Sequence, residues 1–383
     1  MDPFRRRPRQ LRLPAFVLES RPRGLGAWAI GSTYTGTVIG AGFVSGQEIS
    51  RFFLRYGQYG FAGLAVAAIL LGLAGATVLT QAYRRISPAP GRAGPAVPEP
   101  MYNLVTQLFG PFTGGMVDAM VLVLSVVVLV VMVAGGAATL SRVAGWPVPV
   151  AEWATALAAG LCVLGRTKWV TRLNAILIPV LATIITGRAV SLCGQEIPWH
   201  AVVPAPPQPA AVLATRAVMS GIAYAAFNFV LATGPLCHLG CRSESERAAR
   251  WGAWAGGLLV GLLAGLEMML MGARPAPAGT AIPLMHAIAP QAGIWHFLFG
   301  IALWAAILST VTSLGWTLGE SIQLPGARPG ARAFLYVLVT PLLAPLGFAS
   351  LVNIVYPILG ILALPFLLLW LSLPLRHGRN TVS

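Results

Sequence analysis

The segment from Ala27 to Tyr56 reads AWAIGSTYTGTVIGAGFVSGQEISRFFLRY, and the prediction of the whole fold starts from it. The segment is long and apolar enough to cross a bilayer, yet glycines and hydroxyl side chains are concentrated in its middle. Backbone groups freed by a helix break cost several kcal/mol at membrane depth unless protein or water satisfies them. Interrupted helices at this depth are typical of binding sites for solutes and ions. We therefore predict that this segment lines a binding site.

A second interpretation of the same glycines remains open. Small residues allow helices to approach closely in a membrane, so the glycines could serve packing alone. That interpretation leaves Gln47 and Glu48 unexplained, because polar and charged side chains inside a membrane are costly.

The composition defines the class of protein. The chain has 383 residues, of which 56% are hydrophobic and only 10% charged, whereas soluble domains carry about 25% charged residues. The net charge of +15 comes from arginines in short segments between apolar runs, which argues against nucleic acid as a partner. No nucleophile-elbow, zinc-protease or phosphate-loop motif is present. These features predict a polytopic membrane protein that is neither an enzyme nor a nucleotide-driven pump.

Apolar segments of roughly 17–25 residues predict transmembrane helices. Ten such spans are expected, at 26–55, 59–83, 113–142, 148–165, 169–193, 211–237, 248–273, 293–322, 332–348 and 351–373. The proline-rich residues 87–100 are expected to form a loop. Thr280 to Ala289 are expected to form a short helix outside the core.

The distribution of basic residues predicts the orientation. With a cytosolic N-terminus, twenty Arg and Lys residues fall on the cytosolic side and six on the other, as the positive-inside rule requires. Residues 1–25 then form a cytosolic basic arm that contacts anionic lipid, and residues 375–383 form a cytosolic tail.

Ten spans can be divided into two inverted halves of five, at residues 26–195 and 210–374. The sixth span supports this division, because Ala223 to Pro235 reads AYAAFNFVLATGP and ends in a Thr-Gly-Pro sequence that interrupts helical hydrogen bonding. Broken spans at corresponding positions of two halves indicate a transporter site. We predict that spans one and six are both broken.

Span eight carries four hydroxyl side chains in five residues, namely Ser309, Thr310, Thr312 and Ser313. Such hydroxyls often bond back to the carbonyl one turn earlier. Alternatively, the carbonyl of Ala306 and the hydroxyls of Ser309 and Thr310 share one face and form part of a site for a hard cation such as sodium.

Two carboxylates of the spans are candidates for a gate or a proton carrier. Glu48 lies in the outer half of span one, where Arg51 one turn later offers a local ion pair as the simpler explanation. Glu267 lies deeper, in span seven, and the sequence names no partner for it. Carboxylates within a membrane are functional candidates by default.

The run Gly40-Ala-Gly-Phe-Val-Ser-Gly-Gln-Glu48, with Arg51-Phe-Phe and Arg55-Tyr-Gly57 after it, resembles the YkvI family of bacterial membrane proteins. That family is similar to the LeuT-type transporters of the amino acid–polyamine–cation superfamily. The likeness extends over all ten spans in order and spacing, while strong matching is confined to span one. It implies an all-α, five-plus-five fold in the bacterial cytoplasmic (plasma) membrane.

The resemblance also implies two sets of site residues. Its sodium ligands would be the carbonyls of Gly36, Ile39 and Ala306 and the hydroxyls of Ser309 and Thr310. Its substrate site would be lined by Gly40, Ala41, Gly42, Tyr224, Phe227 and Asn228. Many amino acid transporters are less polar where Gln47 and Glu48 stand here, so the substrate class stays open.

Together these features predict a secondary transporter of a small polar solute that works by alternating access, with Na+ as the coupling ion and no other cofactor. Backbone amides at a helix break favour an anionic group, so the solute is expected to carry a carboxylate, as an amino acid does. One alternative is proton coupling through Glu48 or Glu267. Another is a ligand-sensing receptor subunit of the same fold, against which the hydroxyl pair of span eight argues. The oligomeric state is not predicted.

Overall fold

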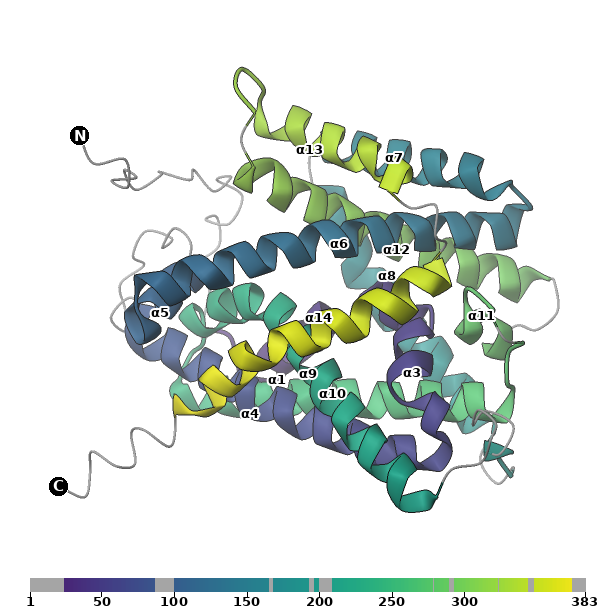
Figure 1. The fold of residues 1–383 in the computed structure, drawn as a ribbon, viewed down its shortest axis with the longest axis horizontal. Coiled ribbons are helices and arrows are strands. Elements are labelled where there is room, and N and C mark those ends of the chain that lie inside the picture. The colour runs from purple at the N-terminus through teal and green to yellow at the C-terminus, as the bar shows by residue number, and fades with distance from the viewer. Residues whose placement is uncertain are drawn as a thin grey trace.

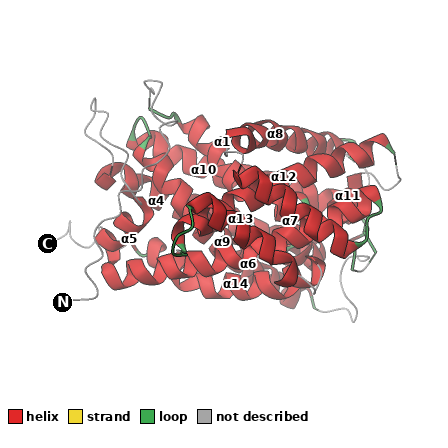
Figure 2. Ribbon diagram, turned by 90° about the horizontal axis from the view of Figure 1, so that it is seen from above, coloured by secondary structure: helices red, strands yellow, loops and turns green. Residues whose placement is uncertain are grey.

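The computed structural model describes residues 24–86, 100–164, 168–192, 196–199, 209–277, 279–288, 293–322, 324–343 and 348–373, and within them it is nearly all helical. The helices are α1 (Ala27–Val38), α2 (Ala41–Val44), α3 (Gln47–Phe52), η2 (Leu54–Tyr59), α4 (Gly60–Ile86), α5 (Pro100–Phe109), α6 (Pro111–Ala144), α7 (Val148–Leu164), α8 (Lys168–Val190), α9 (Ala210–Cys241), α10 (Glu246–Ala273), α11 (Pro283–Ile288), α12 (Ile294–Ser321), α13 (Pro329–Val339), η4 (Thr340–Leu343) and α14 (Phe348–Leu371). Figure 2 shows that helices make up both the interior and the surface.

Helices occupy all ten predicted spans. Among the described residues, six continuous segments are long and apolar enough to cross a membrane. They are Leu54–Arg85, Pro111–Ala144, Ala210–Cys241, Glu246–Ala273, Ile294–Ser321 and Phe348–Leu371. Span one reaches the necessary length only as the sum of α1, α2 and α3.

Span one is interrupted twice. The backbone leaves the helical conformation at Ile39, where ψ is 83°, and again at Gly46, where φ is 79°. The second position requires glycine, because a Cβ there would lie 2.7 Å from the sulfur of Met271 and 2.8 Å from the Cβ of Leu284. The predicted break in span one is confirmed.

The predicted break in span six is wrong. The helix α9 runs without interruption from Ala210 to Cys241, with Pro235 inside it. Proline removes one backbone donor, but membrane helices tolerate it where side-chain hydroxyls and neighbouring helices compensate. The carbonyl that loses its helical donor at Pro235 is that of Leu231, and α4 and α14 pack along α9 and support it through this point.

Two shorter helices differ from expectation. The predicted short helix at 280–289 exists as α11, but five of its six residues are buried in the core rather than outside it. It packs against α10, α12 and α3, which cover its apolar residues. The helix α5 was not predicted, because ten residues are too few to span a bilayer. The expected loop at 87–100 lies outside the described residues except for Pro100, where α5 begins.

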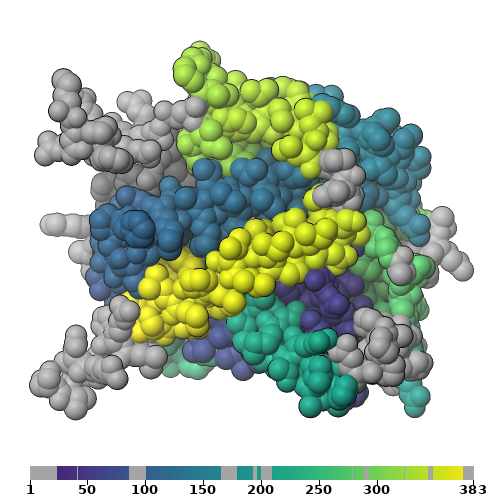
Figure 3. Space-filling model, viewed as in Figure 1, coloured from purple at the N-terminus to yellow at the C-terminus, as the bar shows by residue number. Residues whose placement is uncertain are grey.

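The helices pack as two groups that share a common interior. One group contains α1, α4, α9 and α10, and the other contains α6, α7, α12 and α13. The groups lie on opposite sides of the diagonal helix α14 in Figure 1. Figure 3 shows α14 and α6 side by side on the viewed face.

Helices at corresponding positions of the two halves pack against each other, as α4 does with α10, α6 with α12 and α7 with α13. This pairing agrees with a five-plus-five organisation. The boundaries 26–195 and 210–374 remain predictions. The basic arm falls outside the described residues except for 24 and 25, and the tail at 375–383 does so entirely.

The contact of α1 with α10 depends on small residues. A Cβ at Gly256 would lie 2.5 Å from a ring carbon of Tyr34, and one at Gly252 would lie 2.6 Å from the Cβ of Ile30. The Tyr34 hydroxyl donates to the Leu71 carbonyl of α4 at 2.9 Å. These close contacts hold α1, the inner half of span one, against α10 and α4. The backbone of span one changes direction only after α1, at the break.

Candidate functional site

The break in span one brings a carboxyl group against the backbone of Gly42. A Cβ at Gly42 would overlap Glu48 Oε1 and would lie 3.1 Å from the hydroxyl oxygen of Tyr356. The short helix α2 and the turn at Gly46 fold Glu48 back toward Gly42. Glycine at position 42 is therefore needed to admit the carboxyl group, and α14 supplies the tyrosine beside it.

Four buried polar atoms near this point have no hydrogen-bond partner among the described residues. They are Glu48 Oε2, both carboxyl oxygens of Glu267 and the hydroxyl oxygen of Tyr224. The exposed fraction is 5% for Glu48 and 0% for the other two residues. The helix α3, which carries Glu48, packs against both α9, which carries Tyr224, and α10, which carries Glu267. A Cβ at Gly46, two residues before Glu48, would lie 2.7 Å from the sulfur of Met271, which follows Glu267 by one turn of α10. Spans one, six and seven thus bring unpaired polar groups together in the core.

The expected ion pair between Glu48 and Arg51 does not form. Arg51 instead donates from Nε to the Asn353 carbonyl oxygen at 3.1 Å. The ion pairs within the described part of the chain join Glu246 to Arg84 and to Arg250. The simpler explanation for Glu48 is therefore wrong, because the guanidinium of Arg51 is directed toward α14 rather than back along α3.

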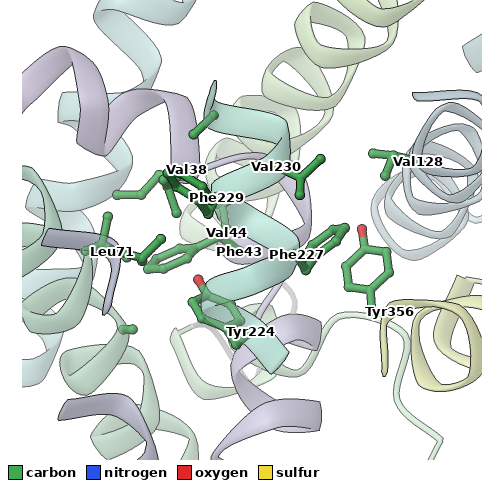
Figure 4. Packing of buried hydrophobic residues seen from close by; sticks show 14 of the residues in the cluster. Val38, Phe43, Val44, Leu71, Val128, Tyr224, Phe227, Phe229, Val230 and Tyr356 are labelled. Atoms are coloured by element: carbon green, nitrogen blue, oxygen red, sulfur yellow. The ribbon is translucent and has the colours of Figure 1, made fainter. Parts of the chain in front are cut away.

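Five aromatic side chains, those of Phe52, Phe53, Tyr224, Phe227 and Tyr356, form an aromatic wall, and the Tyr356 hydroxyl in it lies beside Gly42, as the Glu48 carboxyl group does. The Tyr224 ring lies 5.4 Å from the Phe52 ring and 5.0 Å from the Phe53 ring, centroid to centroid. The Phe227 and Tyr356 rings are 4.7 Å apart. Figure 4 shows these two side by side, with Tyr224 one turn away on α9. All five side chains are buried.

The residues predicted to line the substrate site have different surroundings. A Cβ on Gly40 would meet no described atom within 4 Å, whereas one on Gly42 would overlap Glu48. Ala41 begins α2. Tyr224 and Phe227 belong to the aromatic wall, while Asn228 donates from its side chain to the Tyr224 carbonyl at 3.1 Å. Gly40 is therefore not explained by helix packing, and Asn228 has a local partner.

The predicted sodium ligands of span eight fall into two classes. The Thr310 hydroxyl donates to the Ala306 carbonyl at 3.1 Å, and the Thr312 and Ser313 hydroxyls also bond back one turn. Ser309 is 1% exposed, and its hydroxyl oxygen has no hydrogen-bond partner in the described structure. Back-bonding thus explains three of the four hydroxyls and leaves Ser309 unexplained.

The ligands expected from span one lie at the end of α1. Gly36 is part of α1, and Ile39 is the residue at which its helical conformation ends. The main contacts of α1 are with α10 and α9, while α2 is the part of span one that packs against α12. Because α12 is the eighth span and α2 directly follows the break, the packing of α2 against α12 brings the break close to span eight. Whether the five oxygens bind sodium remains a prediction.

Gln47 connects the outer half of span one to the segment before α11. Its side-chain nitrogen donates to the Thr280 carbonyl at 2.7 Å and to the Ala281 carbonyl at 2.9 Å. The Leu284 amide donates to the Ser45 carbonyl at 3.2 Å. These bonds hold α3 against α11 and position Glu48, the residue that follows Gln47.

Replacing Gln47 with leucine is expected to destabilise the protein by about 1–3 kcal/mol, because two hydrogen bonds are lost from partly buried carbonyls. Thermal unfolding in detergent measures the effect. Gln58→Leu is the control, since this exposed glutamine donates no side-chain bond among those described. Equal melting temperatures for the two variants would contradict the anchoring role of Gln47.

Sequence reasoning missed Tyr356, Phe52 and Phe53. Tyr356 is the one tyrosine in the mainly apolar tenth span and precedes Pro357, so its hydroxyl group was the available signal. The phenylalanines gave no signal, because buried aromatic residues are common in any membrane core. Phe52 and Phe53 belong to the site because their rings pack against the ring of Tyr224.

No group of three or more His, Cys, Asp or Glu side chains that could hold a metal ion occurs in the described ranges. The site offers two carboxyl groups, tyrosine hydroxyls and exposed backbone. Such a set can bind and release a cation or a proton. It contains none of the nucleophile and base pairs that covalent catalysis needs.

Comparison with known structures establishes the fold. A manganese transporter of Eremococcus coleocola superposes with a TM-score of 0.60 and 16% sequence identity, over 91% of this chain and 80% of that one. MhsT in complex with L-phenylalanine superposes with a TM-score of 0.56 and 16% identity, over 92% and 96% of the two chains. The chain is therefore a multi-pass membrane protein of the LeuT-type fold, as predicted.

In sequence, the chain is similar to the uncharacterized membrane protein YkvI of Bacillus subtilis (strain 168). The two are 23% identical over 339 residues, which cover 87% of this chain and 92% of YkvI. No family model matches the chain. The resemblance inferred from the first span is confirmed. None of these similar proteins is described as an enzyme.

Proposed function

We propose that the protein is a secondary active transporter that carries a small polar solute across the bacterial cytoplasmic membrane by alternating access. The observation that carries this proposal is the break at Ile39 and Gly40, beside buried polar atoms that lack partners. A transporter needs binding groups at the middle of the membrane that the protein itself does not satisfy. The fold, shared with proteins described as transporters, supports the same function.

Sodium is the proposed coupling ion. Its ligands would be the carbonyls of Gly36, Ile39 and Ala306 and the hydroxyls of Ser309 and Thr310. The support is Ser309, a buried hydroxyl without a partner in the described structure. Sodium suits neutral oxygen ligands, which these five groups supply, and α2 brings the break next to α12.

A proton is the second candidate for coupling. Glu48 and Glu267 are buried carboxyl groups without an ion-pair partner among the described residues. Buried carboxylates that approach each other take up and release protons as their surroundings change. Proton coupling would use these two residues and would leave Ser309 without a role.

The first experiment is uptake into proteoliposomes that contain the purified protein. A panel of small solutes is screened first by thermal unfolding, with sodium or potassium as the salt. Solutes that stabilise the protein are then offered with an inward gradient of sodium or of protons. We expect one class of solute to accumulate against its own gradient and to leak out when an ionophore collapses the driving gradient.

The gradient that drives accumulation identifies the coupling ion. Binding without accumulation under either gradient would contradict transport and would favour a ligand-sensing receptor subunit. Uptake that stops when the solute concentrations are equal and responds to neither gradient would contradict coupling while leaving transport intact.

A further inference from the structure

The carboxyl groups of Glu48 and Glu267 are the strongest polar feature of the core. Three of their four oxygens are buried without a hydrogen-bond partner among the described residues. Ionised carboxylates in such a position are very costly unless a positive charge pairs with them. The described structure gives neither of them an arginine or lysine partner.

An anionic solute would be repelled at this point. The exposed backbone of Gly42 was expected to receive a carboxylate, but Glu48 Oε1 already lies where a Cβ of Gly42 would be. A second carboxylate there would compete for the same space and would oppose ionisation of Glu48 and Glu267, which a positive charge would favour. The two carboxyl groups accept hydrogen bonds and ionise when a positive charge pairs with them, so they fit a positively charged donor.

The surroundings distinguish between kinds of cation. Ca2+ and Mg2+ take about six or more oxygen ligands, more than two carboxyl groups within an aromatic wall supply, and transition metals usually take three or four His, Cys, Asp or Glu ligands, of which no group of three occurs in the described ranges. An ammonium group needs about three acceptors and is attracted to the faces of aromatic rings. Tyr224 and Tyr356 provide both aromatic faces and hydroxyl oxygens.

On this geometry we infer that Glu48 and Glu267 together bind the ammonium group of a small organic amine, with the aromatic wall of Phe52, Phe53, Tyr224, Phe227 and Tyr356 around its apolar part. This inference rests on the proposed function, because it names the class of solute that the same site carries. Gly40, at the break itself, is two residues from Gly42, and a Cβ there would meet no described atom within 4 Å.

The test compares solutes of equal shape and different charge. Isobutylamine, isobutanol and isobutyrate form one series, and benzylamine, benzyl alcohol and benzoate form a second. Each is added to the purified full-length protein, and thermal unfolding is followed at constant pH and ionic strength. We expect the amines to raise the melting temperature and the alcohols and carboxylates to leave it unchanged.

Two variants connect the response to the carboxyl groups. Glu267→Gln and Glu48→Gln keep the size of each side chain and remove its charge. Each is expected to weaken amine binding by at least about tenfold, the loss of a charge-assisted hydrogen bond. The control is Glu152→Gln on α7, since Glu152 is also buried but belongs to a different part of the core. It should respond to amines as the wild type does.

Several outcomes would overturn the inference. Stabilisation by an alcohol or a carboxylate as strong as that by the matched amine would show that charge is not recognised. An unchanged amine response in both glutamine variants would place the amine elsewhere. Stabilisation by manganese chloride but by no amine, lost in Glu267→Gln, would assign the pair to a metal ion. If no amine in either series stabilises the wild type, the ammonium site is rejected.

Failure of this inference is separate from failure of the transport proposal. Amine binding without accumulation in proteoliposomes would retain the ammonium site and reject transport. Accumulation of an uncharged or anionic solute would retain transport and reject the ammonium site.

Discussion

Replacing Gly40 with leucine is expected to abolish solute binding and to leave the protein folded. A Cβ at this position meets no described atom within 4 Å, so the added side chain fills open space beside the break. The unliganded protein should unfold within about 0.5 kcal/mol of the wild type, as substitutions away from packed features do. A solute at a hundredfold excess over its Kd stabilises the wild type by about 2.7 kcal/mol, and this stabilisation should disappear.

Gly42→Leu is the companion variant, and it is also expected to remove binding. There the new side chain would displace the Glu48 carboxyl group and press on Tyr356, so the unliganded protein loses stability as well. Overpacking of this kind costs about 1–3 kcal/mol. The contrast in stability separates the role of Gly40, which leaves open space, from that of Gly42, which makes room for the Glu48 carboxyl group. Retained solute affinity in Gly40→Leu would mean that the open space is not part of the binding site.

The second large effect is expected at Ser309. Its hydroxyl is buried and has no partner in the described structure, so Ser309→Ala removes an unsatisfied group and should leave the sodium-free stability unchanged or raise it by up to about 1 kcal/mol. If the hydroxyl binds sodium, the same variant loses the sodium dependence of both stability and uptake. Thr310→Ala is expected to lose the sodium dependence too, although its hydroxyl also bonds to Ala306.

Melting temperatures in sodium and in potassium chloride, together with uptake under a sodium gradient, measure this effect. Ser313→Ala is the matched control, because its hydroxyl lies one turn later and donates to the Ser309 carbonyl. A sodium response that survives in both Ser309→Ala and Thr310→Ala would reject the proposed sodium site. The carboxyl pair would then become the favoured site of coupling.

The site is assembled from spans that are far apart in the sequence. Glu48 comes from span one, Tyr224 from span six, Glu267 from span seven and Tyr356 from span ten. Each is a polar residue within a mainly apolar span, and the sequence marked three of them as candidates. Their proximity depends on the packing of α3, α9, α10 and α14, which no local pattern encodes.

The sequence by itself determined the class of protein, the positions of the spans and the break in span one. These properties are local, since the bilayer sets the length of an apolar helix and glycine sets where it can be interrupted. Tertiary structure alone decided that α9 stays continuous through Pro235 and that α11 is buried. It also decided that Arg51 bonds to Asn353 and leaves Glu48 unpaired. Each of these outcomes depends on which groups neighbouring helices supply, and satisfying buried polar groups is a property of the packed molecule as a whole.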